Sequence, residues 1–142
     1  MNSCVVHWRG KKIKFRTDVF ETYKRVLKVL AWCHKRKFPD VNEDDQIAKV
    51  REEWHELKLA YYDYFMNMDE ENFLEFEREY YYEMADVLFA LHGYKRFDEE
   101  DANGYLARWN EKYPIKLCCI PLMIEKLLDV YFIRTYVNNR HI

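Results

Sequence analysis

Two stretches of this chain repeat their apolar residues every three or four positions, and this helical periodicity limits the fold more than any other feature. The first covers about residues 45–65 and the second about residues 70–94. A long helix with one apolar face has to bury that face against other helices. The apolar positions of the first stretch are Ile47, Val50, Trp54, Leu57, Tyr61, Tyr64 and Phe65.

The rest of the chain supports a helical fold. Only three of the 142 residues are Gly and three are Pro, while 49% are hydrophobic, which suits a compact helical domain. We expect further helices at about residues 18–35, 99–111 and 121–136, and either a short β-hairpin or an irregular arm at residues 4–15. The sequence therefore predicts one domain over residues 1–142, an all-α bundle of four to five helices. Predicted N-caps are Thr17 or Asp18, Asp44 or Asp45, and Asp69.

Within this domain we distinguish a basic arm and helix (residues 1–40), a central part (residues 45–112) and a C-terminal helix (residues 115–142), and charge sets the first apart. Residues 1–38 hold eleven Lys or Arg against two Asp or Glu, whereas residues 40–101 hold six against twenty. A basic segment can bind nucleic acid, or it can pack on the acidic part of its own fold or of a partner subunit. We favour packing, since the basic residues are interleaved with apolar ones at helical spacing, and we do not expect nucleic acid as a partner.

Neither a membrane span nor a secretion signal is expected. The first residues lack the apolar run of a signal peptide, and no stretch reaches about 18 uninterrupted apolar residues. The four cysteines, Cys4, Cys33, Cys118 and Cys119, do not have the spacing of a metal-binding finger. We therefore expect reduced thiols in a cytoplasmic protein.

Acidic residues lie beside the apolar face of both central helices. Because successive helix residues rotate by about 100°, Glu53 falls on the shoulder of the first apolar stripe and Glu56 just beyond it. On the second helix Glu83 falls inside the apolar face, and Glu79 and Asp86 fall on one shoulder. Burying an ionised carboxylate without a partner costs several kcal/mol, so these positions call for a specific partner.

A divalent metal ion is the partner that we favour. Residues three apart share a helix face, so four carboxylates meet if the two helices turn these faces toward each other. Their repulsion would raise their pKa values or separate the helices, and Mg²⁺ or Mn²⁺ with oxygen ligands removes that repulsion. The alternative is a set of ordinary ion pairs with Lys49, Lys58 or Arg78. We favour the metal because two neighbouring helices both carry such a pair of acids.

At this point the chain resembles a known family, the MazG-type all-α nucleoside triphosphate pyrophosphohydrolases. The family motif is EExxE, a spacer of a couple of dozen residues, and ExxD. Here residues 52–56 read EEWHE, residues 83–86 read EMAD, and 26 residues separate them. The apolar run DVLFAL after the second motif also matches. The resemblance covers about residues 45–112 and leaves both ends of the chain outside it.

The resemblance implies a hydrolase that cleaves the α–β phosphoanhydride of a nucleoside triphosphate, giving a monophosphate and pyrophosphate. One or more Mg²⁺ ions, with Mn²⁺ as an alternative, would bind the substrate phosphates and activate a water molecule. Glu79 is a better placed general base than Glu52. The implied metal ligands are Glu53, Glu56, Glu83 and Asp86, and the implied catalytic residues are Glu53, Glu56 and Glu79.

Family members hold the phosphates or the base with basic and amide groups after the second motif. The corresponding segment here is RWNEKYP, in which Arg108 and Lys112 are candidates for phosphate binding and Asn110 for phosphate or base. A solvated helix end explains the same residues equally well, since lysine near a helix C-terminus is favourable. We expect a homodimer or homotetramer, because two or three long helices cannot enclose a nucleotide alone.

Two other functions compete with this interpretation. A di-iron carboxylate bundle requires Glu-x-x-His on two helices, but the single such pair, Glu52 and His55, turns away from the core. A non-catalytic helical binding module is the alternative outside the enzymes. Its basic N-terminal region would bind nucleic acid or a protein partner, although the sequence has no recognised nucleic-acid motif.

Overall fold

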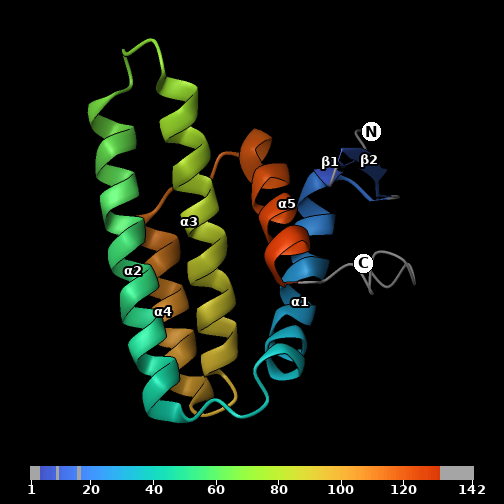
Figure 1. The fold of residues 1–142 in the computed structure, drawn as a ribbon, viewed down its shortest axis with the longest axis vertical. Helices are drawn as coiled ribbons and strands as arrows, with labels where there is room; N and C mark the ends of the chain where they lie inside the picture. Colours follow the sequence, from blue (N-terminus) through green and yellow to red (C-terminus); the bar gives the residue numbers. More distant parts are fainter. Residues whose placement is uncertain (1–3, 9, 16, 132–142) are drawn as a thin grey trace.

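The computed structural model describes residues 4–8, 10–15 and 17–131, and these residues form five α-helices and one β-hairpin (Figure 1). The predicted all-α class is confirmed for this part of the chain. The elements are β1 (Val5–Trp8), β2 (Lys11–Lys14), α1 (Val19–Lys37), α2 (Glu43–Met66), α3 (Phe73–Tyr94), α4 (Glu99–Lys112), the 3₁₀ turn η1 (Leu117–Cys119) and α5 (Ile120–Tyr131).

Helix α3 is the centre of the fold. It runs antiparallel to α2, and it also contacts α1, α4 and α5, so four helices surround it (Figure 1). Every residue from Met84 to Tyr94 is buried. Apart from Asp86 and His92, this half of α3 is apolar on all sides, and a helix of that composition is stable only inside a protein. Figure 1 places α2 on one side of α3 and α1 and α5 on the other.

Aromatic rings fix α4 and the segment after it against α2 and α3. The Trp54 ring centroid lies 5.8 Å from that of Tyr105 and 5.9 Å from that of Tyr113. Nearly three turns further along α2, Tyr64 stacks on Tyr80 of α3 with the ring centroids 5.0 Å apart. This packing buries the faces of α2 and α3 that carry the aromatic residues.

The N-terminal residues form the hairpin rather than an irregular arm. Val5 pairs with Lys14 and Val6 with Ile13 in an antiparallel register. Gly10 sits in the turn with a φ of 76°, a left-handed conformation that favours glycine. The hairpin packs on α5 through β1.

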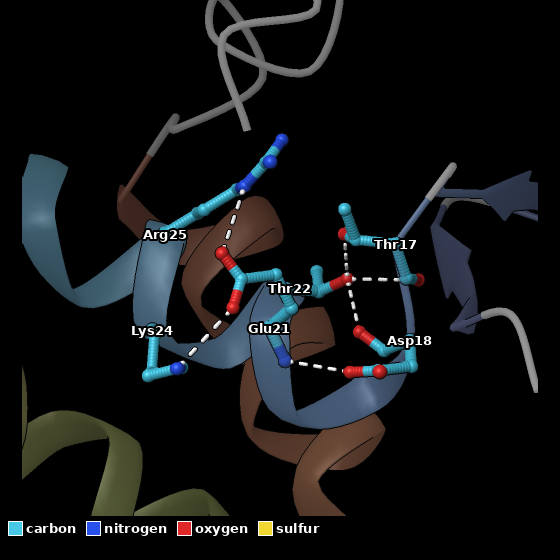
Figure 2. Close-up of polar contacts among 6 residues, drawn as sticks. All are labelled: Thr17, Asp18, Glu21, Thr22, Lys24 and Arg25. Atoms are coloured by element: carbon cyan, nitrogen blue, oxygen red, sulfur yellow. Dashed lines mark hydrogen bonds and ion pairs between the residues drawn. The ribbon is translucent and has the colours of Figure 1, made fainter.

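Helix α1 begins where the sequence indicates. The Asp18 carboxylate accepts a hydrogen bond of 2.8 Å from the Glu21 N–H, which makes Asp18 the N-cap (Figure 2). Thr22 Oγ1 donates a hydrogen bond of 2.7 Å to the Asp18 carbonyl, which adds a side-chain bond to the first turn of α1. Figure 2 also shows Glu21 paired with Lys24 and Arg25 on the outer side of the helix.

Several predicted boundaries are wrong by a few residues. Helix α2 starts at Glu43, because Asn42, not Asp44 or Asp45, caps it by accepting from the Asp45 N–H. Helix α3 starts at Phe73, because the turns that precede it extend to Asn72 rather than ending at Asp69.

Two further differences concern the predicted core and the last helix. Phe65, predicted in the apolar stripe of α2, is 61% exposed, since at this end the α2–α3 pair extends beyond α4 (Figure 1). The predicted C-terminal helix starts at Ile120, and its predicted end lies outside the described residues. Within those residues, no helix is both long enough and apolar enough to cross a membrane.

Candidate metal centre

Three acids of the two sequence motifs converge between α2 and α3. One carboxylate oxygen each of Glu53, Glu56 and Glu83 lies within 4.8 Å of the other two. Glu53 and Glu56 stand one turn apart on α2, and Glu83 reaches them from the antiparallel α3. The structure thus brings together three of the four acids that the sequence proposes as metal ligands.

The fourth acid, Asp86, lies next to this cluster. It is buried one turn after Glu83, and its negative charge contributes to the raised pKa of both Glu53 and Glu83. Asp86 Oδ2 also lies 3.7 Å from the Nζ of Lys126, which comes from α5. Lys126 could not be predicted at this place, because contact between α5 and α3 depends on tertiary packing.

Two carboxylate oxygens in the cluster are buried without a hydrogen-bond partner among the described residues. Glu53 is 6% exposed; its Oε1 lies 3.0 Å from Lys49 Nζ, but its Oε2 has no such partner. Glu83 Oε2 is in the same situation. Leaving a buried acceptor unsatisfied costs about 1–3 kcal/mol, and more if it is charged, so a cation between these oxygens fits the donor set.

Burial and mutual repulsion shift the acids toward their protonated forms. Burial raises the pKa of Glu53, although the hydrogen bond from Lys49 acts in the opposite direction. Burial, a hydrogen bond with Glu79 and the charges of Asp86 and Glu56 raise the pKa of Glu83 to about 8. A bound divalent cation would favour the carboxylate forms and remove this repulsion.

The two general-base candidates differ in position. Glu79 is exposed on α3, one turn before Glu83, and lies within hydrogen-bonding reach of it. Glu52 is exposed on α2, and its Oε2 lies 3.6 Å from Lys49 Nζ. Glu79 therefore touches the cluster directly, whereas Glu52 stands at its edge.

A cleft of about 220 Å³ between α1, α2 and α3 opens beside the acids. Glu53 and Asp86 belong both to its lining and to the acid group, and Lys49 adds a positive charge. Phe38, Val41, Phe89 and Ala90 give the cleft its apolar walls.

Gln46 and His34, which line the cleft, contact residues of α3 that also line it. Gln46 Nε2 donates to the Ala90 carbonyl at 2.8 Å, which ties α2 to α3. The His34 ring lies 5.1 Å from the Phe89 ring, centroid to centroid, and burial together with the nearby charge of Arg96 lowers the pKa of His34 to about 4. This cleft could not be predicted from the sequence, since His34 and Phe38, which line it, belong to no motif.

The three proposed phosphate and base contacts lie elsewhere. Arg108, Asn110 and Lys112 are all exposed on α4, and none of them lines the cleft. The Arg108 guanidinium lies 4.5 Å from the centroid of the Tyr105 ring, and Lys112 Nζ lies 5.8 Å from that of Tyr113. Within this chain, the structure does not bring these three residues to the acids.

Comparisons with known proteins identify no relative. A scan against protein-family models, a search of curated proteins and a search of solved structures each found no match.

Proposed function

We propose that this protein is a metal-dependent nucleoside triphosphate pyrophosphohydrolase of the MazG-like type. The observation that carries the proposal is the convergence of Glu53, Glu56 and Glu83, with two buried carboxylate oxygens that lack a partner among the described residues. These acids belong to the EExxE and ExxD motifs. This group of acids would repel a polyphosphate unless cations were bound between the carboxylates and the phosphates.

The donor set suits Mg²⁺ or Mn²⁺, since every candidate ligand is a carboxylate. Glu53, Glu56, Glu83 and Asp86 would hold the metal. When bound, it would offset the charge of the phosphates and lower the pKa of a water molecule. Glu79, beside Glu83, is our candidate to accept the proton of that water.

The cleft provides a place for the nucleoside. Its apolar walls, including Phe38 and Phe89, suit a planar base, and Glu53 and Asp86 connect it to the acid group. A nucleotide with its base in the cleft would therefore present its α-phosphate to the acids. Hydrolysis breaks the bond between the α-phosphorus and the oxygen that bridges to the β-phosphorus, which releases the monophosphate and pyrophosphate.

We infer that two or four copies of the chain assemble. Large apolar side chains are exposed at the far end of the α2–α3 pair, among them Tyr62, Phe65, Met66 and Leu74. Exposed apolar groups gathered in one region favour association. Light scattering after size-exclusion chromatography would test this, with Leu74→Lys expected to shift the protein toward the monomer.

The first experiment is a measurement of pyrophosphate release from a panel of canonical and modified nucleoside triphosphates, with Mg²⁺, with Mn²⁺ and with EDTA. We expect metal-dependent release with the monophosphate as co-product. Glu53→Gln and Glu83→Gln should abolish release, whereas Lys28→Gln on the outer face of α1 should not. Folded protein that releases no pyrophosphate under any condition would remove the proposal.

A second candidate function is binding of a polyanion by α1. Phe20 and Trp32 are 56% and 42% exposed on this basic helix. Lys24 Nζ lies 5.1 Å from the centroid of the Phe20 ring, and the Arg36 guanidinium lies 4.6 Å from that of Trp32. Exposed aromatic rings among cations suit single-stranded nucleic acid. Fluorescence anisotropy with a labelled single-stranded oligonucleotide tests this function, and salt-dependent binding lost in Arg36→Glu would support it.

A further inference from the structure

Two cations gather on one aromatic ring beside the acid group, where α5 packs on α3. Lys126 Nζ lies 5.2 Å from the centroid of the Tyr82 ring, in addition to its 3.7 Å contact with Asp86 Oδ2. Arg78, one turn before Tyr82 on α3, places its guanidinium 4.9 Å from the same centroid. The Tyr82 ring therefore lies next to both Lys126, which contacts Asp86, and Arg78, which comes from the preceding turn of α3.

The cleft, the acids and these cations follow one another along α3. Phe89 and Ala90 line the cleft, Asp86 and Glu83 contribute to the acid group, and Tyr82 and Arg78 come next toward the N-terminus of the helix. With a rise of 1.5 Å per residue, the twelve positions from residue 90 to residue 78 span about 18 Å. A nucleoside triphosphate with its base in the cleft and its α-phosphate at the acids would extend its last two phosphates along this line.

We propose that Lys126 and Arg78 bind the β- and γ-phosphates of the substrate, the part that leaves as pyrophosphate. The inference rests on the proposed function and adds to it a pyrophosphate-binding subsite. Lys126 lies on α5, outside the region that resembles the MazG family, so the C-terminal helix gains a part in the site. An ammonium and a guanidinium are suitable partners, because phosphate oxygens accept strong charge-assisted hydrogen bonds from both.

Both cations already face carboxylates in the absence of substrate. Lys126 contacts Asp86. Burial raises the pKa of Glu125, and the nearby charge of Arg78 acts against this rise. Glu125 also accepts a hydrogen bond from the backbone N–H of His7. Pyrophosphate alone would therefore meet acids as well as cations. A metal that engages Asp86 would leave Lys126 available for the phosphates, so pyrophosphate binding should require the metal.

Calorimetric titration of the full chain with inorganic pyrophosphate, in Mn²⁺ and in EDTA, tests the subsite without turnover. Mn²⁺ binding alone is measured first, by the loss of the free-ion electron paramagnetic resonance signal. Lys126→Gln and Arg78→Gln should each weaken pyrophosphate binding by about tenfold or more, the size expected for one charge-assisted hydrogen bond, and should still bind Mn²⁺. Lys126→Arg should restore much of the affinity.

The matched control is Lys58→Gln, an exposed lysine of α2 that lies beside Trp54 in a separate hollow. It should bind pyrophosphate like the unmodified chain. Pyrophosphate affinity that is unchanged in Lys126→Gln and Arg78→Gln while Mn²⁺ still binds would overturn the subsite and leave the proposed function in place. Failure of the unmodified chain to bind Mn²⁺ would overturn both. Should Lys126→Gln lose its helical circular dichroism, Arg78→Gln and Lys126→Arg decide the outcome.

Discussion

Gly93 of α3 faces His34 of α1 so closely that a Cβ atom at position 93 would overlap the imidazole ring. Both residues are buried, and the ring is further confined by Phe38 and Phe89. We therefore expect Gly93→Ala to lower the free energy of unfolding by about 1–3 kcal/mol, the usual cost of overpacking a core. Urea denaturation followed by circular dichroism measures this change.

Gly104→Ala on α4 is the matched control for that experiment. The nearest atom to a Cβ there is Arg108 Nη1, at 3.9 Å, so the methyl group meets no obstacle. Since alanine is the better helix former, this variant should gain about 0.5–1 kcal/mol. A Gly93→Ala protein as stable as Gly104→Ala would show that α1 and α3 are not held together by this close approach.

Local pattern was sufficient to predict the helices, because their apolar periodicity and their caps are properties of neighbouring residues. Asp18 illustrates this, since its capping bond is made within the first turn of α1. The predictions were wrong where neighbouring residues compete to cap a helix, or where burial depends on the position of the residue in the tertiary structure. Asn42 caps α2 ahead of the two aspartates that follow it, and Phe65 is exposed although its spacing is that of a core residue.

The candidate site also has a part that could be predicted from the sequence and a part that could not. Glu53, Glu56 and Glu83 were predictable, since rotation about two helix axes places them beside the apolar faces that pack together. The cleft beside them and the approach of Lys126 were not, because both depend on where α1 and α5 rest on α3. No periodicity in the sequence specifies that placement.

The buried histidines should make the protein less stable in mild acid. Burial lowers the pKa of His34 and of His92 to about 4, whereas the unfolded chain titrates near the ordinary value of 6.5. Between these values the unfolded state binds more protons, so stability is lost as pH falls from about 6.5 to 4, by about 1 kcal/mol per histidine between pH 6 and 5.

The melting temperature of His92→Gln at several pH values between 7 and 5 checks this. Its slope against pH should be shallower than that of the unmodified chain, and His55→Gln, at an exposed position of α2, should leave the slope unchanged. Equal slopes in all three proteins would mean that His92 is not kept neutral by the fold.

In metal-free protein, Glu83 should change stability with pH in the opposite direction to the histidines. Its pKa is raised from 4.5 to about 8 in the fold, so its contribution to stability is present below pH 4.5 and is lost as pH rises through 8. Glu83→Gln removes the charge, and in EDTA it should melt roughly 2–6 °C above the unmodified chain at pH 8.5 but near it at pH 5. Saturating Mg²⁺ should stabilise only the unmodified chain. The same melting difference at both pH values would contradict this account.

The ion pair of Lys49 and Glu53 should prove strongly coupled. Lys49 Nζ is 3.0 Å from Glu53 Oε1, and the other oxygen of this buried carboxylate has no hydrogen-bond partner among the described residues. Lys49→Met would leave Glu53 without this bond and should cost about 1–2 kcal/mol in EDTA at pH 7. In Lys49→Met/Glu53→Gln neither member of the pair is charged, so the double variant should lose less than the two single losses combined. Urea denaturation of all four proteins gives the coupling energy, and strictly additive losses would show that the two side chains act independently.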